Sequence, residues 1–311
     1  MTISQLEYIV AVDDLRHFGL AAERCFVTQP TLSMQIQKLE NELGIKIFDR
    51  SVKPVTPTEV GREIITRARS ILREAGTIKQ IINDRKNVLS GEVRIGIIPT
   101  LAPYLLPPLF KKLRSDYPAL NLNIRELVTR DIVQDLKNNK LDFGLAATPL
   151  NDPIIHEHVL FYEEMFLYVS RKNALIDKKY VLPAEINPDQ LWLLEEGHCF
   201  RTQILNFCEL QRSAVFHCHY ETGNIESLKR MVDQSDGLTM LPELAVLEIR
   251  APGLRQVKRL RQPAPVREIS LITHRDQIKT RLIEAIKRSV LSIVPAHMQK
   301  LDNRKVLELS Y

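Results

Sequence analysis

Apolar residues near the start of the chain recur at helical spacing and predict two short helices joined by a turn within residues 18–43. The first helix carries the small pair Ala21-Ala22, which allows a close helix crossing. Four aliphatic side chains fall on one face of the second helix: Leu32, Ile36, Leu39 and Leu43. Thr28 is typical of a residue that caps a helix start, and Gly44 of one that ends a helix. The second helix is therefore expected to have a buried apolar face and an exposed polar one.

The polar face of this second helix and the segment after it are suited to DNA. Residues placed to meet base edges or phosphates in a major groove lie on that face and in its first turn: Gln29, Pro30, Thr31, Ser33, Gln35 and Lys38. Residues 46–56 have the pattern of a short extended wing, from which Arg50 and Lys53 would contact the DNA backbone. A plain helical hairpin with a polar outer face has the same periodicity. The pattern alone thus leaves DNA binding and a structural hairpin open.

Residues 58–89 are predicted to form one long helix. Its apolar positions alternate at spacings of four and three, as in the seam of a coiled coil: Ile64, Ala68, Ile71, Ala75, Ile78 and Ile82. A single amphipathic helix that packs on its own domain is the simpler explanation. The regularity over almost three heptads favours a partner helix, so we expect a linker that dimerises.

From residue 90 onward, strands and helices alternate along the chain. They are predicted in the order strand 92–98, helix 102–115, strand 120–128, helix 129–138 and strand 141–146. Such alternation implies a parallel sheet with right-handed crossovers, and ligands of such sheets bind at the carboxyl ends of the strands. Thr100 and Thr129 each follow a strand and would face one cleft. Either threonine taken singly also fits an ordinary helix cap, so both interpretations stay open.

A second α/β unit is predicted from about residue 164 to 266. Its elements are a helix that begins near Cys199, a strand at 215–221, a helix at 224–233 and a strand at 237–241. A strand at 267–274 and a helix at 277–294 are expected to rejoin the first unit, so that two lobes joined by crossing strands form a clamp. Residues 300–311 are charged and are expected to pack loosely.

Composition and charge narrow the class of protein. The net charge of +5 is compatible with DNA binding, but residues 1–89 carry 13 Lys+Arg against 11 Asp+Glu, so any DNA-binding role rests on pattern rather than on bulk charge. The first residues lack the features of a signal peptide, and no apolar run is long enough to span a membrane. Four cysteines in 311 residues do not make a secreted disulfide scaffold. We therefore expect a cytosolic protein without a membrane partner.

Two of the four cysteines lie in contrasting surroundings. Cys199 follows His198 and precedes Arg201 at a predicted helix start, where positive charge and free N–H groups favour the reactive thiolate. Cys208 follows Phe207 on the apolar face of the same predicted helix, where a thiol stays neutral. Cys25 fits a small apolar residue of the helix-turn-helix core. A zinc site that also uses His217-Cys218-His219 is less favoured, because alternate strand residues point to opposite faces and no Cys-x-x-Cys anchors it.

Specific motifs resemble a known family. The segment Thr28-Gln29-Pro30-Thr31-Leu32-Ser33 resembles the winged helix-turn-helix of LysR-type transcriptional regulators, and the linker and two-lobed region extend the likeness over essentially the whole chain. Four further segments resemble the hydrogen-peroxide-sensing members: Ile97-Ile98-Pro99-Thr100, Pro103-Tyr104-Leu105-Leu106-Pro107, Glu195-Glu196-Gly197-His198-Cys199 and Phe207-Cys208. His217-Cys218-His219 departs from that pattern and leaves the role of Cys218 open.

The resemblance implies an α/β protein of three parts. A winged helix-turn-helix at 1–57 would bind DNA, a helix at 58–89 would link and dimerise, and residues 90–311 would form a two-lobed redox-sensing region resembling a periplasmic binding protein. Lobe I would comprise about 90–163 and 267–297, and lobe II about 164–266.

The resemblance also implies roles for single residues and for partners. Cys199 would be the peroxidatic cysteine, which attacks peroxide, and Cys208 the resolving one, and the peroxide pocket would comprise Thr100, Thr129, Gly197, His198 and Arg201. Expected partners are double-stranded DNA, hydrogen peroxide, RNA polymerase, a cellular thiol reductant and further copies of the chain in a dimer of dimers. Neither a cofactor nor a metal is expected, and the chain would be a transcriptional activator of antioxidant genes rather than an enzyme.

Chemistry supports this reading, while two other classes remain in view. Attack of a thiolate on peroxide expels hydroxide, so hydroxyl and N–H donors must face the leaving oxygen. A helix over 200–209 would place Cys199 and Cys208 about 13 Å apart, so it must unwind before they join. The alternatives are a LysR-type regulator of a small organic effector and a thiol peroxidase, against which the predicted DNA-binding region argues.

Overall fold

The computed structural model describes residues 1–85, 89–208, 222–261, 263–277, 279–302 and 304–307. The chain divides into two compact units. Unit 1 comprises Met1–Leu89 with Asn138–Lys140, and unit 2 comprises Ser90–Lys137 with Leu141–Tyr311.

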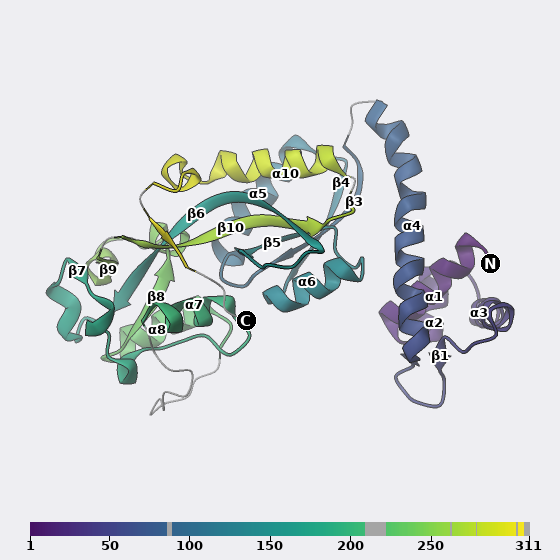
Figure 1. Ribbon diagram of the computed structural model, residues 1–311, viewed down its shortest axis with the longest axis horizontal. Helices are drawn as coiled ribbons and strands as arrows, with labels where there is room; N and C mark the ends of the chain where they lie inside the picture. The colour runs from purple at the N-terminus through teal and green to yellow at the C-terminus, as the bar shows by residue number, and fades with distance from the viewer. Residues whose placement is uncertain (86–88, 209–221, 262, 278, 303, 308–311) are drawn as a thin grey trace. The chain divides into compact units, whose positions relative to one another are not determined.

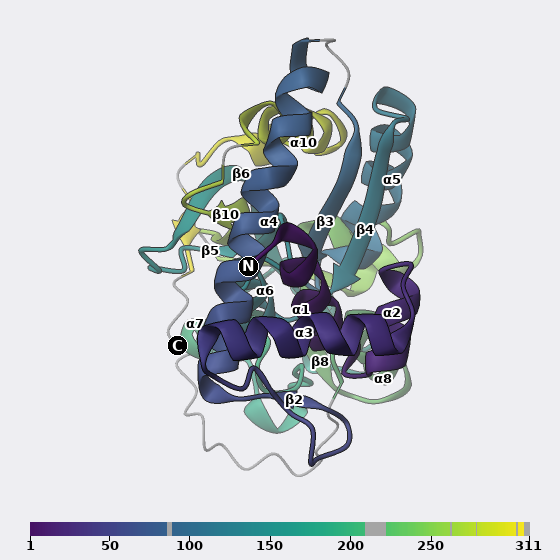
Figure 2. The same cartoon turned by 90° about the vertical axis from the view of Figure 1, so that its right-hand side faces the viewer.

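Unit 1 is a winged helix-turn-helix followed by a long helix (Figure 2). Its elements are α1 (Ile3–Leu15), α2 (Phe18–Arg24), α3 (Gln29–Leu43), β1 (Phe48–Asp49), β2 (Thr56–Pro57) and α4 (Glu59–Arg85). The side chain of Thr28 accepts a hydrogen bond from the Thr31 N–H at 3.4 Å, and Gly44 ends α3 in the left-handed conformation at φ 70°. Both predicted ends of this helix are therefore confirmed, and the antiparallel pair β1–β2 forms the predicted wing.

Packing within unit 1 corrects two expectations. Leu43 was expected on the buried face of α3 but is 40% exposed, and it is the last residue of that helix. The seam predicted along α4 is also divided. Ala68 is buried in the core of unit 1 and Ile64 packs against that core, whereas Ile71 is 40% exposed. The first part of α4 thus packs on its own domain, as in the simpler explanation of its pattern, and Ile71 is the first seam residue left to face a partner.

Unit 2 is built on one mixed sheet of nine strands (Figure 1). Its main strands are β3 (Gly91–Ile97), β4 (Leu120–Glu126), β5 (Phe143–Thr148), β6 (Ile155–Val169), β7 (Tyr180–Val181), β8 (Leu238–Pro242), β9 (Val257–Leu260), β10 (Pro265–His274) and β11 (Lys305–Val306). The order is β4-β3-β5-β10-β6-β9-β7, with β11 on β10 and β8 on β6. The part built around β3, β4 and β5 is here lobe I, and the part around β7, β8 and β9 is lobe II.

The α/β class is confirmed, and the sheet is parallel only within lobe I. There β3 runs parallel to β4 and β5, as alternation predicts. The strands β6 and β10 are antiparallel to each other and run through both lobes, because one carries the chain into lobe II and the other brings it back. The helices of the unit are α5 (Ala102–Asp116), α6 (Thr129–Lys137), α7 (Cys199–Phe207), α8 (Ile225–Gln234), α9 (Glu243–Leu247) and α10 (Thr280–Ile293). Short 3-10 turns lie at Ala174–Asp177, Pro183–Glu185, Pro188–Gln190, Gly253–Gln256 and Ala296–Gln299.

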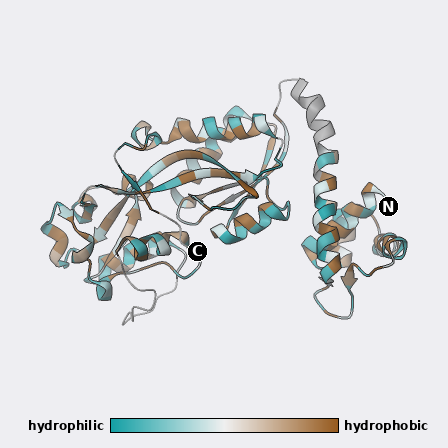
Figure 3. Cartoon of the chain, in the orientation of Figure 1, coloured by the Kyte–Doolittle hydropathy of each residue, from teal (hydrophilic) through white to brown (hydrophobic). Residues whose placement is uncertain are grey.

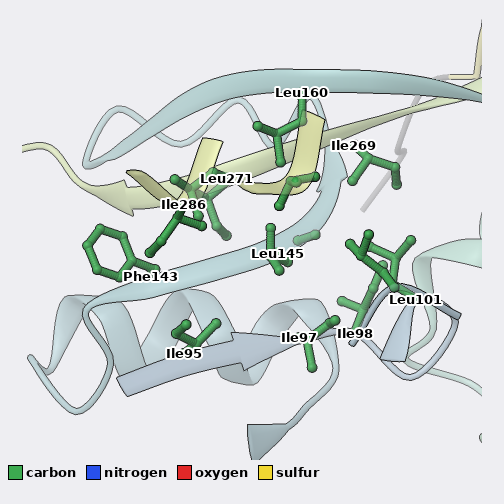
Figure 4. Close-up of a cluster of buried hydrophobic side chains, with 14 of the residues drawn as sticks. Ile95, Ile97, Ile98, Leu101, Phe143, Leu145, Leu160, Ile269, Leu271 and Ile286 are labelled. Atoms are coloured by element: carbon green, nitrogen blue, oxygen red, sulfur yellow. The ribbon is translucent and has the colours of Figure 1, made fainter. Parts of the chain in front are cut away.

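Each lobe has its own apolar core. The lobe I core is formed by strand side chains such as Ile95, Phe143 and Leu271, with Ile286 of α10 between Leu271 and Phe143 in the view of Figure 4. Apolar residues follow the central strands, while polar residues mark the outer sides of α6 and α10 (Figure 3). The lobe II core gathers side chains from α7, α8, β6 and β8. Two separate cores joined by continuous strands let the lobes keep their packing while their junction changes.

The end of the described chain packs more firmly than the sequence suggests. Residues 300–311 were expected to pack loosely, but β11 pairs with β10, and the Leu307 N–H donates to the Val266 carbonyl at 2.8 Å. The Leu307 side chain is 6% exposed in the lobe II core. The expectation was wrong for residues 305–307, because the two apolar residues Val306 and Leu307 suffice to dock a segment that is otherwise charged.

Candidate functional site: a cysteine at the junction of two lobes

Cys199 is the first residue of α7 in lobe II. Before it, Gly197 has φ 94°, a conformation that favours glycine and lets the chain turn into the helix. His198 occupies the N-cap of this helix. Side chains that leave α7 on one side enter the lobe II core: Phe200, Ile204, Leu205 and Cys208. The helix is thus anchored in lobe II along its length.

The thiol of Cys199 contacts the other lobe. Its Sγ donates a hydrogen bond to Thr129 Oγ1 at 3.1 Å, and its side chain packs against the lobe I core. Thr129 is buried and is the first residue of α6, just beyond the carboxyl end of β4. A cysteine rooted in lobe II is therefore held by a hydroxyl of lobe I, at the strand end where sheets of this kind bind ligands.

A buried ion pair lies at the same junction. Arg267 of β10 donates from Nε to Glu163 Oε2 of β6 at 2.7 Å, and their side chains are 1% and 0% exposed. The same guanidinium donates from Nη1 to Thr100 Oγ1 at 2.7 Å and from Nη2 to the Thr100 carbonyl at 3.3 Å. It also lies 5.2 Å from the ring centroid of Phe200 in α7. Arg267 thus joins the crossing strands to Thr100 in lobe I and to the helix that begins at Cys199.

Neither Arg267 nor Glu163 belongs to a motif that points to function. The signal available in the sequence is that each charge interrupts an apolar strand, and a charge inside such a run is costly unless it is paired. The remaining carboxylate oxygen of Glu163 accepts the Leu244 N–H at 2.9 Å. Burial raises the pKa of Glu163, and Arg267 opposes that shift.

The predicted pocket residues are placed at different depths. Thr100 and Thr129 are both buried at carboxyl ends of neighbouring strands, as expected. Thr129 contacts the Cys199 thiol, while Thr100 is held by Arg267. His198 is buried with its Nε2 3.5 Å from Glu195 Oε1.

Two of the predicted residues serve the backbone around α7. Gly197 is exposed and forms the turn into the helix. Arg201 donates from Nη1 to the Leu194 carbonyl at 2.9 Å, which fixes the start of α7 on the preceding segment. A second arginine, Arg267, contacts α7 from β10 through the ring of Phe200.

Cys208 lies at the opposite end of α7. It is 8% exposed in the lobe II core, and burial raises the pKa of its thiol to about 12. Its N–H donates to the Ile204 carbonyl at 2.9 Å, so the helix is intact up to this residue. Nine residues of α-helix rise about 13 Å, whereas a disulfide needs Cα atoms within about 7 Å. The two cysteines, both free thiols here, cannot join while α7 is formed.

The C-terminal strand helps to hold α7 in place. Gln203 of α7 is fully buried, and its Nε2 donates to the Leu307 carbonyl at 3.3 Å. Its Oε1 has no hydrogen-bond partner among the described residues. Because an unpartnered buried oxygen costs free energy, the folded form of α7 carries a penalty that unwinding would remove.

A second contact between the lobes lies beside this site. Tyr104 of α5 packs against both cores, and its hydroxyl donates to Glu226 Oε1 of α8 at 2.7 Å. Burial and the Glu226 carboxylate raise the pKa of Tyr104, so its hydroxyl keeps the proton that it donates. The junction is thus held by this hydrogen bond, by the Cys199–Thr129 contact and by the crossing strands.

Some of the residues predicted to contact DNA have exposed side chains, and others form hydrogen bonds within unit 1. Gln29, Pro30, Lys38 and Lys53 are exposed. The hydroxyl of Thr31 lies 2.8 Å from that of Thr28, and Gln35 Oε1 accepts from Gln5 Nε2 at 3.3 Å.

Arg50 of the wing is tied to α3. It donates from Nη1 to Ser33 Oγ at 3.2 Å and pairs through Nη2 with the buried Glu40 at 3.4 Å. Its guanidinium, 39% exposed, thus fixes the wing on the helix as well as offering charge at the surface.

The other sulfur and histidine residues add no second site in the described part of the chain. Cys25 packs against the core of unit 1, as predicted, and burial raises its pKa. The segment His217-Cys218-His219 and the strand predicted at 215–221 lie outside the described residues. Among described residues no cluster of three metal-ligating side chains occurs, and no helix is long and apolar enough to cross a membrane.

The fold and the site identify the family. The model of the bacterial regulatory helix-turn-helix protein, lysR family, matches residues 3–62, and that of the LysR substrate binding domain matches residues 86–292. The chain belongs to the LysR family of bacterial regulatory proteins.

Two similar proteins and one similar structure match almost the full length of the chain. The hydrogen peroxide-inducible genes activator of Dickeya chrysanthemi is 34% identical over 302 residues, which cover 97% of this chain and 99% of that protein. The DNA-binding transcriptional dual regulator OxyR of Escherichia coli K12 is 33% identical, with 98% and 100% covered. A structure of full-length OxyR from Pseudomonas aeruginosa superposes with a TM-score of 0.81 at 33% identity and covers 94% of this chain and 98% of that one.

Proposed function

We propose that this chain is a peroxide-sensing, DNA-binding transcription regulator that is switched by a reversible Cys199–Cys208 disulfide. Relatives that match essentially the whole chain include a hydrogen peroxide-inducible genes activator and the regulator OxyR. In this proposal residues 1–57 bind DNA, 58–89 link and dimerise, and 90–311 sense peroxide, with lobe I at about 90–163 and 267–297 and lobe II at about 164–266. Control of antioxidant genes in the cytoplasm follows from that role.

The first chemical step takes place at Cys199. Its thiol loses a proton, and the thiolate attacks one peroxide oxygen, which breaks the O–O bond and releases hydroxide that takes up a proton to become water. The product is a sulfenic acid. Hydroxyls of Thr129 and Thr100, the backbone N–H of Gly197 or His198 and the His198 ring are the proposed donors to the peroxide oxygens, and Arg201 lies beside them in the proposed pocket. The contact between Cys199 and Thr129 supports this most directly, because it places a hydroxyl on the sulfur that reacts.

The second step joins the two cysteines. The Cys208 thiol attacks the sulfenic sulfur, an S–S bond forms and water leaves. Cys208 must first leave the lobe II core, so α7 unwinds and the Cys199–Thr129 contact between the lobes is lost. A cellular dithiol would restore both thiols by exchange. The two arrangements of α7 are the two states that a switch requires.

Further partners belong to the same proposal. The exposed side of Ile71 on α4 supports a dimer, and a dimer of dimers would read paired half-sites in double-stranded DNA. RNA polymerase would be the partner whose activity at the promoter depends on the redox state of the chain. In this proposal the chain acts as a sensor whose output is transcription and not as an enzyme, and sustained catalytic consumption of peroxide would favour the alternative of a thiol peroxidase.

A peptide map before and after a brief peroxide pulse tests this function. We expect the pulse to yield a Cys199–Cys208 linked peptide while Cys25 and Cys218 stay free. In Cys208→Ser a sulfenic acid should accumulate at Cys199, detectable with a dimedone probe, and Cys199→Ser should not respond. Cys25→Ser serves as the matched control and should behave like the unmodified chain. A dominant Cys208–Cys218 linkage, or an unmodified Cys199 in the activated protein, would overturn the assignment.

DNA binding through α3 gives a separate prediction. Lys38 is exposed on the polar face of that helix and lacks an ion pair among the described residues. Lys38→Ala is expected to weaken binding and to lower the slope of log K against log salt by about 0.9, the value for one lost phosphate contact. Titrations of a selected DNA duplex at several salt concentrations measure both quantities. Lys300→Ala, which removes a charge far along the sequence in unit 2, is the control, and an equal effect there would argue against a specific contact.

A further inference from the structure

Two segments of lobe II together carry a larger net positive charge than the chain as a whole. Residues 171–185 and 250–261 together contain nine Lys or Arg against two Asp or Glu, a local excess of +7 in a chain whose net charge is +5. All other residues therefore sum to −2, although residues 1–89 contain the winged helix-turn-helix and carry +2. The net positive charge is therefore concentrated in these two segments of unit 2 and not in the helix-turn-helix of unit 1.

The two segments form one continuous surface. The short strand β7 from the first segment pairs with β9 from the second, so that Tyr180 lies opposite Arg259. Three further contacts join them: Arg171 Nε to Gln256 Oε1 at 3.4 Å, Arg255 Nη2 to Asp177 Oδ1 at 2.8 Å, and the Arg261 N–H to the Val181 carbonyl at 3.2 Å. Residues distant in the sequence are thus placed side by side along the edge of the sheet.

Most of this charge is not neutralised within lobe II. The two acidic residues are used by two ion pairs, Arg255 with Asp177 and Lys178 with Glu185. Lys258 is buried, its Nζ donates to the Arg255 carbonyl at 2.6 Å, and burial lowers its pKa. The six cations that remain are exposed and have no ion-pair partner among the described residues: Arg171, Lys172, Lys179, Arg250, Arg259 and Arg261. These six residues are here called the basic edge.

The chemistry of the basic edge fits a polyanion with regularly spaced charges. Four of its six cations are arginines, whose planar guanidinium groups bind phosphate oxygens through two parallel hydrogen bonds. They are mounted on or beside paired strands at the end of the sheet, where β7 is the last strand and Tyr180 is 50% exposed. Six like charges on one edge repel one another, and a row of phosphates relieves that repulsion and releases condensed counterions.

We propose that the basic edge binds the phosphodiester backbone of double-stranded DNA outside the site read by α3. The proposal rests on the DNA binding proposed above. Once α3 has engaged its site, flanking duplex is tethered to the same protein and is present at high effective concentration, so even weak phosphate contacts add to affinity. The edge would supply sequence-independent contacts that hold flanking DNA against the regulatory part of the chain.

The test compares two full-length variants of equal charge. The edge variant carries Lys179→Gln, Arg259→Gln and Arg261→Gln. The control variant carries Lys111→Gln, Arg288→Gln and Lys300→Gln, which are exposed in unit 2 outside the basic edge. Each is titrated at several salt concentrations with a short duplex that contains only the selected site and with a longer duplex that adds flanks. Circular dichroism and thermal melting verify that both are folded.

On the longer duplex we expect the edge variant to bind at least about tenfold more weakly than the control variant, with a salt slope smaller by about 3, since each lost phosphate contact removes about 0.9. On the short duplex the two variants should bind alike. The short duplex also separates this proposal from the proposed function. If the unmodified chain does not bind the short duplex, DNA binding through α3 itself is contradicted. Equal affinities and slopes on the longer duplex overturn the proposal. So does an edge variant that binds both duplexes normally but fails to activate RNA polymerase, which would assign the edge to an acidic protein surface.

Discussion

Ile204→Ala is expected to accelerate formation of the Cys199–Cys208 disulfide by at least about tenfold. Ile204 is fully buried in the lobe II core, and truncation of such a side chain costs about 2–5 kcal/mol. That cost falls on the docked form of α7 and not on the unwound form, in which the side chain is already exposed. Since each 1.4 kcal/mol is a factor of ten in an equilibrium, the unwound population rises by that factor or more.

The measurement is a quenched-flow assay of the second step. Cys199 is first converted to the sulfenic acid with one equivalent of peroxide, so that overoxidation stays negligible, and the loss of the sulfenic acid is followed with a dimedone probe. The matched control is Ile225→Ala, which removes the same atoms from α8 in the same core without touching α7. If the two variants accelerate the step equally, general loosening of lobe II and not release of α7 sets the rate.

Glu163→Gln is expected to lower the free energy of unfolding of unit 2 by about 3–5 kcal/mol, because it leaves the guanidinium of Arg267 buried without a counter-charge. The glutamine side chain has nearly the same shape and its amide oxygen still accepts a hydrogen bond, so the expected loss of unfolding free energy reflects the missing negative charge. The single tryptophan of the chain, Trp192, packs against the lobe II core and provides a fluorescence signal for urea unfolding.

The control for this prediction is Asp177→Asn. It makes the same chemical change in an ion pair whose two side chains are 78% and 72% exposed, and such pairs contribute about 0–1 kcal/mol. A loss at Glu163 no larger than at Asp177 would show that water or another group compensates Arg267. A selective loss at Glu163 should also slow sulfenic acid formation, because Arg267 positions Thr100 and packs on Phe200.

Local sequence patterns predict much of the architecture because they depend on near neighbours. The caps Thr28 and Gly44, the wing and the alternating elements of lobe I all follow from spacing and from residues with restricted backbone preferences. Cys199 and Cys208 differ in the structure as their neighbours suggest, one at a helix start and one in a core. What these features share is that the interaction partner lies within one or two turns of chain.

The remaining features depend on contacts between distant segments. The partner of Arg267 is 104 residues away in β6, and Leu307 docks beside Gln203. The periodicity of apolar residues does not predict such contacts, because each forms only when distant segments of the chain have come together. Packing on the rest of unit 1 likewise decides that Ala68 is buried while Ile71, on the same predicted seam, is exposed.

The burial of Cys208 limits the range of peroxide concentrations to which the chain can respond reversibly. In the proposed mechanism, a sulfenic acid at Cys199 either condenses with Cys208 or reacts with a second peroxide and becomes a sulfinic acid, which thiols do not reduce. The first rate is set by the opening of α7 and is independent of dose, whereas the second rises in proportion to dose. Above the concentration at which the two rates are equal, most molecules leave the reversible cycle. The stability of one nine-residue helix therefore fixes an upper limit of detection, and substitutions that tighten its packing would lower that limit.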